Sequence, residues 1–230
     1  MSVNMYCKIV SFKEVHDMTR KVADEVKASG YKPTTVIGLA RGGWIPARLM
    51  CDFLGITDLC SLKVEHWLQT GKTKNEATIK YPLAGDFAGK RFLVVDDIAD
   101  TGKSLITSTE YLKQLNISEI RTATMQYIPQ SKFKPDYFGE EVKIWTWFIY
   151  PWNWIEDTST LIVRLLCTQK DRSWSFGEIK KGLKEYFKIQ WNEVMLRTII
   201  KTMVERGQIV AKRGDRILTY KLEAENVIQL

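Results

Sequence analysis

The segment VVDDIADTGKS, residues 94–104, holds the residues of this chain whose types and spacing best suit chemistry. Two adjacent carboxylates, Asp96 and Asp97, are followed by Asp100 and then by Gly-Lys-Ser at 102–104. A Gly-Lys-Ser turn at the start of a helix is typical of sites where backbone N–H groups hold a phosphate. Carboxylates repel phosphate, so their number in this segment requires an explanation.

The spacing excludes a P-loop. That motif reads GxxxxGK[ST], and counting back from Gly102 places Asp97 where the first glycine must stand. The pattern instead predicts two neighbouring subsites. Backbone N–H groups of residues 101–104 would hold a phosphate dianion, and Asp96 with Asp97 would hold Mg²⁺ or sugar hydroxyls. Phosphoribosyl pyrophosphate (PRPP) has groups that match both subsites.

The elements that must position these residues alternate between strand and helix patterns. Short apolar runs predict strands, periodic apolar positions predict helices, and the alternation predicts an α/β fold with a parallel sheet covered on both faces. Ligands of such sheets bind at the carboxyl ends of the strands, where both glycine turns of this chain lie. The predicted strands are 34–40, 61–67, 91–97, 121–127 and 143–150, and the predicted helices are 12–29, 44–55 and 101–115.

The stretch between Trp67 and Phe92 is polar, bears glycine and is longer than an ordinary connection. It predicts either a surface hairpin or a lid over a site. Lys72 and Lys74 lie in it.

The sequence changes character after Pro151. Three successive helical patterns, at 159–167, 175–187 and 191–207, precede a hairpin pattern that turns at Gly214 and Asp215. They predict a small helical domain. If the hairpin packs on the helices, this domain has the arrangement of a winged helix. Its basic residues are spread along several helices, so we do not expect nucleic acid as a partner.

Composition limits the location and the class of partner. The formal net charge of +7 favours anionic partners. Four scattered cysteines suit a reducing compartment, and no signal peptide or membrane span is expected. These features predict a cytoplasmic protein.

Two motifs resemble those of type I phosphoribosyltransferases. LVVDDIADTGKSL (93–105) is similar to that family's PRPP signature, and GLARGGWIPARLM (38–50) is similar to its pyrophosphate loop. TWFIYPWNW (146–154) resembles the base-binding segment of microbial xanthine-guanine and archaeal purine enzymes. The resemblance implies a phosphoribosyltransferase domain over residues 1–155. It leaves residues 156–230, where the helical and hairpin patterns predict a helical domain similar to a winged helix.

The resemblance also implies roles for the matched residues. Asp96 and Asp97 would hold the ribose hydroxyls and Mg²⁺, and Asp100 would face N7 of the purine as general acid or base. Trp147 would stack on the base, and the backbone of Phe148 would read its edge. The implied PRPP site comprises Arg41, Gly42, Gly43, Asp96, Asp97, Ile98, Ala99, Asp100, Thr101, Gly102, Lys103 and Ser104.

Catalysis would draw on Asp100 and on cations around the diphosphate. The resemblance implies that Arg41 binds the pyrophosphate and that the peptide at Ala40-Arg41 is strained. It also implies that the loop with Lys72 and Lys74 closes over the diphosphate. His16 and His66 receive no role.

The choice of base depends on one departure from the family pattern. In similar 6-oxopurine enzymes a lysine after the penultimate strand donates to the oxo group, and Ile128 stands at that point here. Because isoleucine has no donor, we expect adenine as the base, giving AMP and pyrophosphate in a Mg²⁺-dependent homodimer. Hypoxanthine or guanine is the alternative if Lys132 or Lys134 supplies the donor.

A second class of function stays open. Some transcription regulators join a phosphoribosyltransferase fold to a winged helix and use PRPP only as an effector. The lysine-bearing loop and Trp147 favour the enzyme.

Overall fold

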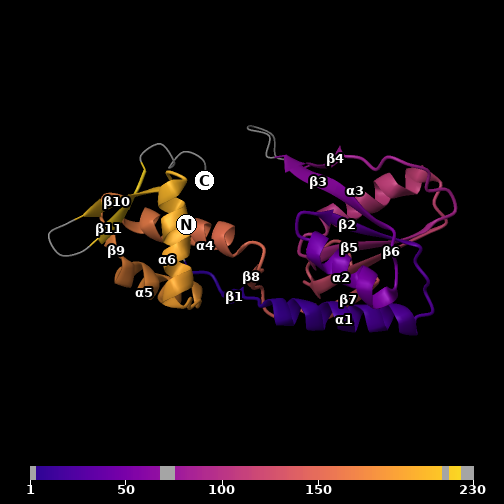
Figure 1. Ribbon diagram of the computed structural model, residues 1–230, viewed down its shortest axis with the longest axis horizontal. Coiled ribbons are helices and arrows are strands. Elements are labelled where there is room, and N and C mark those ends of the chain that lie inside the picture. The colour runs from indigo at the N-terminus through magenta and orange to yellow at the C-terminus, as the bar shows by residue number, and fades with distance from the viewer. Residues whose placement is uncertain (1–3, 68–75, 214–217, 224–230) are drawn as a thin grey trace. The chain divides into compact units, whose positions relative to one another are not determined.

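The computed structural model describes residues 4–67, 76–213 and 218–223. The chain divides into two compact units (Figure 1). The sheet unit is Phe12–Ile144, and the tail unit combines Met1–Ser11 with Trp145–Leu230. This division differs from the predicted one at 155/156. The reason is strand pairing: β1 (Cys7–Ile9) pairs in parallel with β8 (Trp147–Ile149), which joins both segments to the tail unit.

The sheet unit contains a six-stranded sheet in the order β4-β3-β2-β5-β6-β7. All neighbours are parallel except β3 and β4, which are antiparallel, so the predicted mostly parallel α/β fold is confirmed. The strands are β2 (Thr35–Ala40), β3 (Leu59–Trp67), β4 (Glu76–Tyr81), β5 (Arg91–Ala99), β6 (Glu119–Tyr127) and β7 (Tyr137–Glu141).

The helices of this unit cover both faces of the sheet. They are α1 (Phe12–Ala28), α2 (Trp44–Leu54) and α3 (Lys103–Leu112), the last extended by the 3₁₀ turn Lys113–Leu115. Val22 of α1 and Met50 of α2 pack in one buried cluster with Val95 of β5. Leu105 of α3 packs in a second cluster with Val94 of the same strand. Successive residues of β5 thus point to opposite cores, as its continuous apolar run requires.

Two strand predictions were incomplete. The edge strand β7, with the sequence YFGEE, was not predicted because it is short and lacks a β-branched apolar run. The predicted strand 143–150 forms only at Trp147–Ile149 and belongs to the tail unit rather than to the large sheet.

In the segment between Trp67 and Phe92, β4 pairs antiparallel with β3, which agrees with the predicted hairpin alternative. Lys72 and Lys74 lie outside the described residues.

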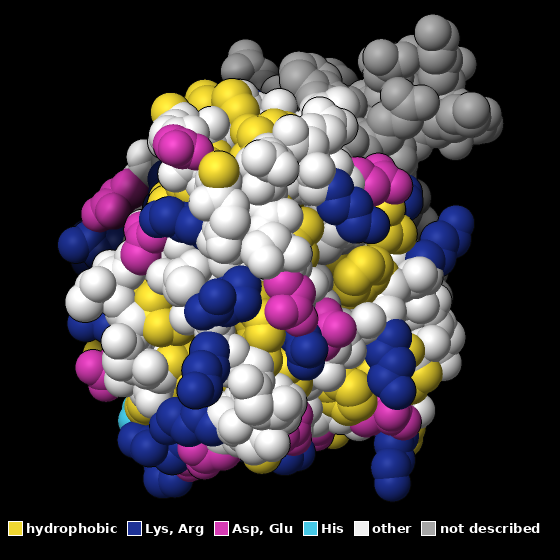
Figure 2. All heavy atoms as spheres, turned by 90° about the vertical axis from the view of Figure 1, so that its right-hand side faces the viewer, with side chains coloured by type: hydrophobic (Ala, Val, Ile, Leu, Met, Phe, Trp, Pro, Cys, Tyr) yellow, Lys and Arg dark blue, Asp and Glu magenta, His cyan; other side chains and the backbone are white. Residues whose placement is uncertain are grey.

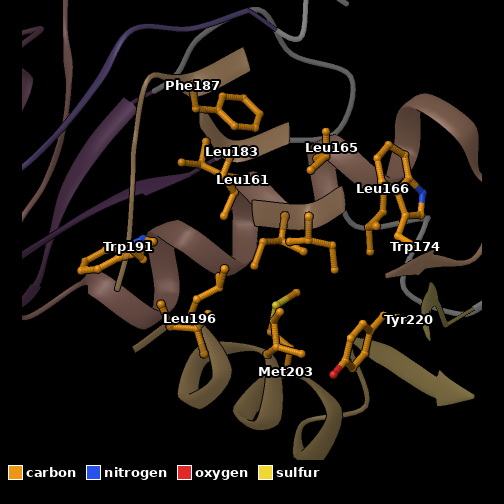
Figure 3. Packing of buried hydrophobic residues seen from close by; sticks show 14 of the residues in the cluster. Leu161, Leu165, Leu166, Trp174, Leu183, Phe187, Trp191, Leu196, Met203 and Tyr220 are labelled. Atoms are coloured by element: carbon orange, nitrogen blue, oxygen red, sulfur yellow. The ribbon is translucent and has the colours of Figure 1, made fainter. Parts of the chain in front are cut away.

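The tail unit has its own hydrophobic core (Figure 3). Its three helices were all predicted, and the capping box of Ser175 with Glu178 begins the second of them. Leu161, Leu183 and Leu196, one from each helix, are at most 2 % exposed. The elements are α4 (Trp154–Leu166), the 3₁₀ turn Cys167–Gln169, β9 (Trp174–Ser175), α5 (Phe176–Phe187), α6 (Glu193–Glu205), β10 (Ile209–Arg213) and β11 (Leu218–Leu222).

The last strands of the tail unit form an antiparallel sheet in the order β10-β11-β9. Two helices followed by such a strand pair are typical of winged-helix modules. The predicted turn at Gly214 and Asp215 lies outside the described residues.

One face of the molecule mixes charges of both signs. Figure 2 shows Lys and Arg side chains interspersed with Asp and Glu side chains, with hydrophobic side chains between them. This mixture is typical of a solvated protein surface. Within the described residues, each helix is too short or too polar to cross a membrane.

Candidate active site

The sheet register brings the two glycine turns together. β2 and β5 are parallel neighbours, with Gly38 opposite Val95, so both strands run toward the same edge. β2 ends at Ala40 and β5 ends at Ala99. The residues that follow these two ends therefore meet at the carboxyl edge of the sheet, as predicted.

Gly42 lies directly against Asp97. A Cβ built on Gly42 would lie 2.7 Å from Oδ1 of Asp97 and closer still to the other atoms of that carboxylate. A side chain at position 42 would require the Asp97 carboxylate to shift. The contact places the pyrophosphate-loop motif and the aspartate pair in one site, although more than fifty residues separate them in the sequence.

Gly43 makes a second close approach. A Cβ there would lie 2.8 Å from the nitrogen of Leu39 and would overlap the carbonyl oxygen of Val95. The N–H of Gly43 donates to the carbonyl of Leu39 at 2.8 Å, which folds the turn back on β2. The peptide bond between Ala40 and Arg41 is cis, and Arg41 is exposed. The turn thus carries Arg41 one residue before the glycine that lies against Asp97.

Local hydrogen bonds orient the two carboxylates. Oδ1 of Asp96 accepts from the N–H of Asp97 at 3.0 Å, and Oδ1 of Asp97 accepts from the N–H of Ile98 at 2.9 Å. Burial, together with the adjacent charge of Asp97, raises the pKa of Asp96 well above its usual range. Two carboxylates held so close are stabilised by a bound cation or by sugar hydroxyls that donate to them.

A pocket of about 390 Å³ opens on this segment. Its volume lies within the range of small-ligand sites. It brings together ten consecutive residues, nine of which were predicted to bind PRPP. The lining residues are Asp96, Asp97, Ile98, Ala99, Asp100, Thr101, Gly102, Lys103, Ser104 and Leu105.

The predicted phosphate subsite corresponds to the start of α3. Gly102, the N-cap residue, has φ of 77°, a left-handed conformation that glycine adopts without strain. The first turn of α3 contains no acidic residue. Because a helix amino terminus carries partial positive charge and N–H donors, residues 101–104 suit an anion.

The aspartate pair could supply part of the coordination of a Mg²⁺ ion, with substrate phosphates supplying the rest. Among the described residues, no group of three or more His, Cys, Asp or Glu could hold a metal. Mg²⁺ is commonly bound by one or two carboxylates together with substrate phosphates, and Asp96 and Asp97 provide that part of the coordination. The donor set therefore agrees with a metal that arrives with its ligand.

The remaining predicted residues differ in their surroundings. Asp100 is exposed in the pocket wall. Ile128 is only 2 % exposed, so its side chain belongs to the core. Trp147, 39 % exposed, and the half-buried Phe148 lie on β8 in the tail unit, and their contact with a base stays a prediction.

Sequence reasoning missed two residues beside the pocket. Ser131 and Phe133 pack against Gly102, where a Cβ would lie 2.7 Å from the Oγ of Ser131 and the Cβ of Phe133. The sequence SKF has no periodicity or motif that signals this contact.

Residues 10–156 match the family model described as "Phosphoribosyl transferase domain". The matched segment covers the whole sheet unit and extends into β8 and the start of α4. Residues 157–230 lie outside it.

Individual relatives agree with this match. The chain is 27 % identical over 145 residues to a xanthine-guanine phosphoribosyltransferase of Idiomarina loihiensis, covering 63 % of this chain and 85 % of that protein. It is 30 % identical over 152 residues to the enzyme of the same name from Cereibacter sphaeroides, with the same coverage. A solved purine phosphoribosyltransferase of Pyrococcus horikoshii is 32 % identical, with a TM-score of 0.57, covering 64 % of this chain and 94 % of that one.

Proposed function

Since the chain belongs to the phosphoribosyl transferase domain family, we propose that it transfers the 5-phosphoribosyl group of PRPP to N9 of a 6-oxopurine. The bond between C1′ and the pyrophosphate oxygen breaks, and the bond between C1′ and N9 forms. The purine loses one proton from N7, and the carboxylate of Asp100 accepts that proton. The products are a purine nucleoside monophosphate and pyrophosphate.

The contact between Gly42 and Asp97 carries this proposal. It joins a turn suited to the diphosphate with a carboxylate pair suited to the ribose. The pocket continues from that pair to the helix start that would hold the 5′-phosphate. The two charged groups of PRPP and its neutral ribose would thus each have a chemically matched neighbour in one continuous site.

The residues of the site have separate roles in the reaction. Arg41 binds the diphosphate and stabilises the negative charge that develops on it as it leaves. Asp96 and Asp97 bind the ribose hydroxyls and would hold Mg²⁺, which when bound supplies positive charge to the leaving group. Their charges also favour the positive charge that develops on the ribose.

The identity of the base is the finer part of the proposal. The relatives named for xanthine and guanine support a 6-oxopurine, which was the alternative in the sequence analysis. Adenine, the first expectation, rests on Ile128, which has no donor. That side chain is 2 % exposed, and the names of the relatives are the stronger support for the base.

A turnover assay with PRPP and Mg²⁺ tests the proposal. Hypoxanthine, guanine, xanthine and adenine are offered separately, and nucleotide formation is followed by chromatography. We expect the highest kcat/KM with a 6-oxopurine. Preference for adenine would contradict the choice of base and restore the first expectation.

A PRPP-sensing regulator is the second candidate, because the strand order of the tail unit is typical of winged-helix modules. Turnover of any purine decides against a purely regulatory role. PRPP binding without turnover, together with steeply salt-dependent binding to duplex DNA, would decide for it.

A further inference from the structure

Trp44 bonds the diphosphate turn to a neighbouring strand. The diphosphate turn is residues 41–43, and α2 begins directly after it at Trp44. The indole Nε1–H of Trp44 donates to the Oγ of Ser61 on β3 at 2.5 Å. The turn itself leaves the sheet from β2, which ends at Ala40. The bond therefore attaches the far end of the turn to a strand other than the one that leads into it.

Gly38 provides the space for this bond. In the parallel pairing of β2 with β3, Gly38 lies opposite Ser61. A Cβ on Gly38 would lie 3.5 Å from Cδ1 of Trp44 and 3.0 Å from the Cβ of Ala47, so α2 packs directly on the backbone of β2 there. Because glycine has no side chain, the indole crosses β2 and reaches the hydroxyl on the next strand.

The start of α2 has no side-chain cap of its own. Its N-cap residue is Gly43, which has no side chain that could accept from the first N–H groups of the helix. The N–H of Trp44 donates to the carbonyl of Arg41 at 3.4 Å, which is long for such a bond. The bond between Trp44 and Ser61 thus adds a side-chain anchor where the turn passes into the helix.

The exposure of the two side chains favours a positioning role over core packing. Trp44 is 52 % exposed, and Ser61 is exposed as well. Burial stabilises a fold in proportion to the apolar area removed from water, so a half-exposed indole provides only part of that stabilisation. The ring of Trp44 instead carries a donor across β2 to a fixed acceptor.

We propose that Trp44 and Ser61 are positioning residues, which hold the diphosphate turn in the conformation that binds pyrophosphate. The inference rests on the proposed phosphoribosyl transfer and concerns the leaving-group half of that site. The turn contains Arg41 and the glycine that lies against Asp97. When the bond is absent, the ligand must order the turn on binding, and that ordering lowers affinity.

The test compares Trp44→Phe with wild type, because phenylalanine keeps an aromatic ring over Gly38 and removes the N–H donor. Calorimetric titration gives Kd for pyrophosphate with Mg²⁺ and, separately, Kd for inosine monophosphate. We expect Kd for pyrophosphate to rise about three- to tenfold, which is the order of one net neutral hydrogen bond. Kd for inosine monophosphate should stay unchanged, because its phosphate is assigned to the start of α3. A merely destabilised site would weaken both ligands.

Variants of Ser61 test the bond from its other end. Ser61→Ala removes the acceptor and should raise Kd for pyrophosphate by the same factor as Trp44→Phe. Ser61→Thr keeps the hydroxyl and should bind pyrophosphate as wild type does. The variant with both Trp44→Phe and Ser61→Ala should bind no more weakly than either single variant, because both changes remove the same bond. Losses that add in the double variant would contradict the inference.

Trp191→Phe is the matched control. The indole of Trp191 donates to Oγ1 of Thr158 at 3.1 Å, which is a bond of the same kind inside the tail unit. Its loss should leave both dissociation constants unchanged. Undiminished pyrophosphate affinity in Trp44→Phe would overturn the inference, and so would equal weakening of pyrophosphate and inosine monophosphate.

Failure of the inference is distinguishable from failure of the proposed function. A wild-type protein that binds neither pyrophosphate nor inosine monophosphate contradicts the proposed function before any variant is compared. A wild-type protein that binds both, together with undiminished affinities in Trp44→Phe and Ser61→Ala, contradicts only the role of Trp44 and Ser61.

Discussion

The α-carbon of Gly42 lies against the carboxylate of Asp97, and no room is left there for a methyl group. The contact fixes the distance between the turn after β2 and the end of β5. In the proposed site PRPP spans both, so the contact would determine where its diphosphate and its ribose lie relative to each other.

Replacing Gly42 with alanine should therefore lower activity far more than stability. The added Cβ displaces the Asp97 side chain, and a displacement of about 1 Å at a catalytic site costs about 10²-fold in rate. Steady-state kinetics and thermal unfolding measure the two effects. Gly177→Ala in α5, where a Cβ meets nothing within 4 Å, is the matched control and should leave turnover unchanged. Equal turnover in both variants would refute the assigned contact.

Replacing Asp96 with asparagine should raise stability at neutral pH. The pKa of Asp96 is raised in the folded protein, so the fold favours its protonated form. The contribution of Asp96 to the free energy of unfolding is complete below its pKa in the unfolded chain, about 3.9. That contribution is lost as the pH rises through the pKa of Asp96 in the folded protein. Each unit of that shift is worth about 1.4 kcal/mol.

Because asparagine carries no charge, the variant escapes this loss. The difference in melting temperature between Asp96→Asn and wild type should be positive at pH 7.5 and should shrink toward zero below pH 4. Activity should fall, since the variant loses a carboxylate of the ribose subsite. A melting-temperature difference that does not change with pH would show that Asp96 is not destabilised by its surroundings.

Replacing Leu165 with alanine should destabilise the tail unit selectively. Leu165 is fully buried and lies against Gly182, where an added Cβ would come within 2.8 Å of Cδ1 of the leucine. Such truncations cost about 2–5 kcal/mol. Because the tail unit and the sheet unit have separate cores, calorimetry should show one transition lowered while the other keeps its temperature. Val194→Ala, at a position 78 % exposed, should change neither. A uniform downward shift would mean that the units unfold together.

The part of the candidate site that lines the pocket was predictable from the sequence because its residues are consecutive. The segment from Asp96 to Ser104 follows a continuous apolar strand, and such strands place their carboxyl ends at the ligand edge. The capping box at Ser175 was predictable for a similar reason, since its two members are three residues apart.

Contacts that join distant segments were not predictable. The pairing of Cys7 with Trp147 was not predicted, because nothing local in either strand selects the other as its partner. The packing of Ser131 on Gly102 likewise depends on where β6 ends relative to β5. The choice of base was not predictable from Ile128 alone, and the relatives named for xanthine and guanine favour the alternative to adenine.

Calorimetric titration of PRPP in the presence of Mg²⁺ tests the central claim most directly, because it does not depend on which base is used. The wild-type chain should bind one PRPP per site, and chelating Mg²⁺ or replacing Asp97 with asparagine should weaken binding at least about tenfold, or 1.4 kcal/mol. Absence of binding to the wild type, or undiminished binding to the Asp97 variant, would contradict the assignment of this pocket to PRPP.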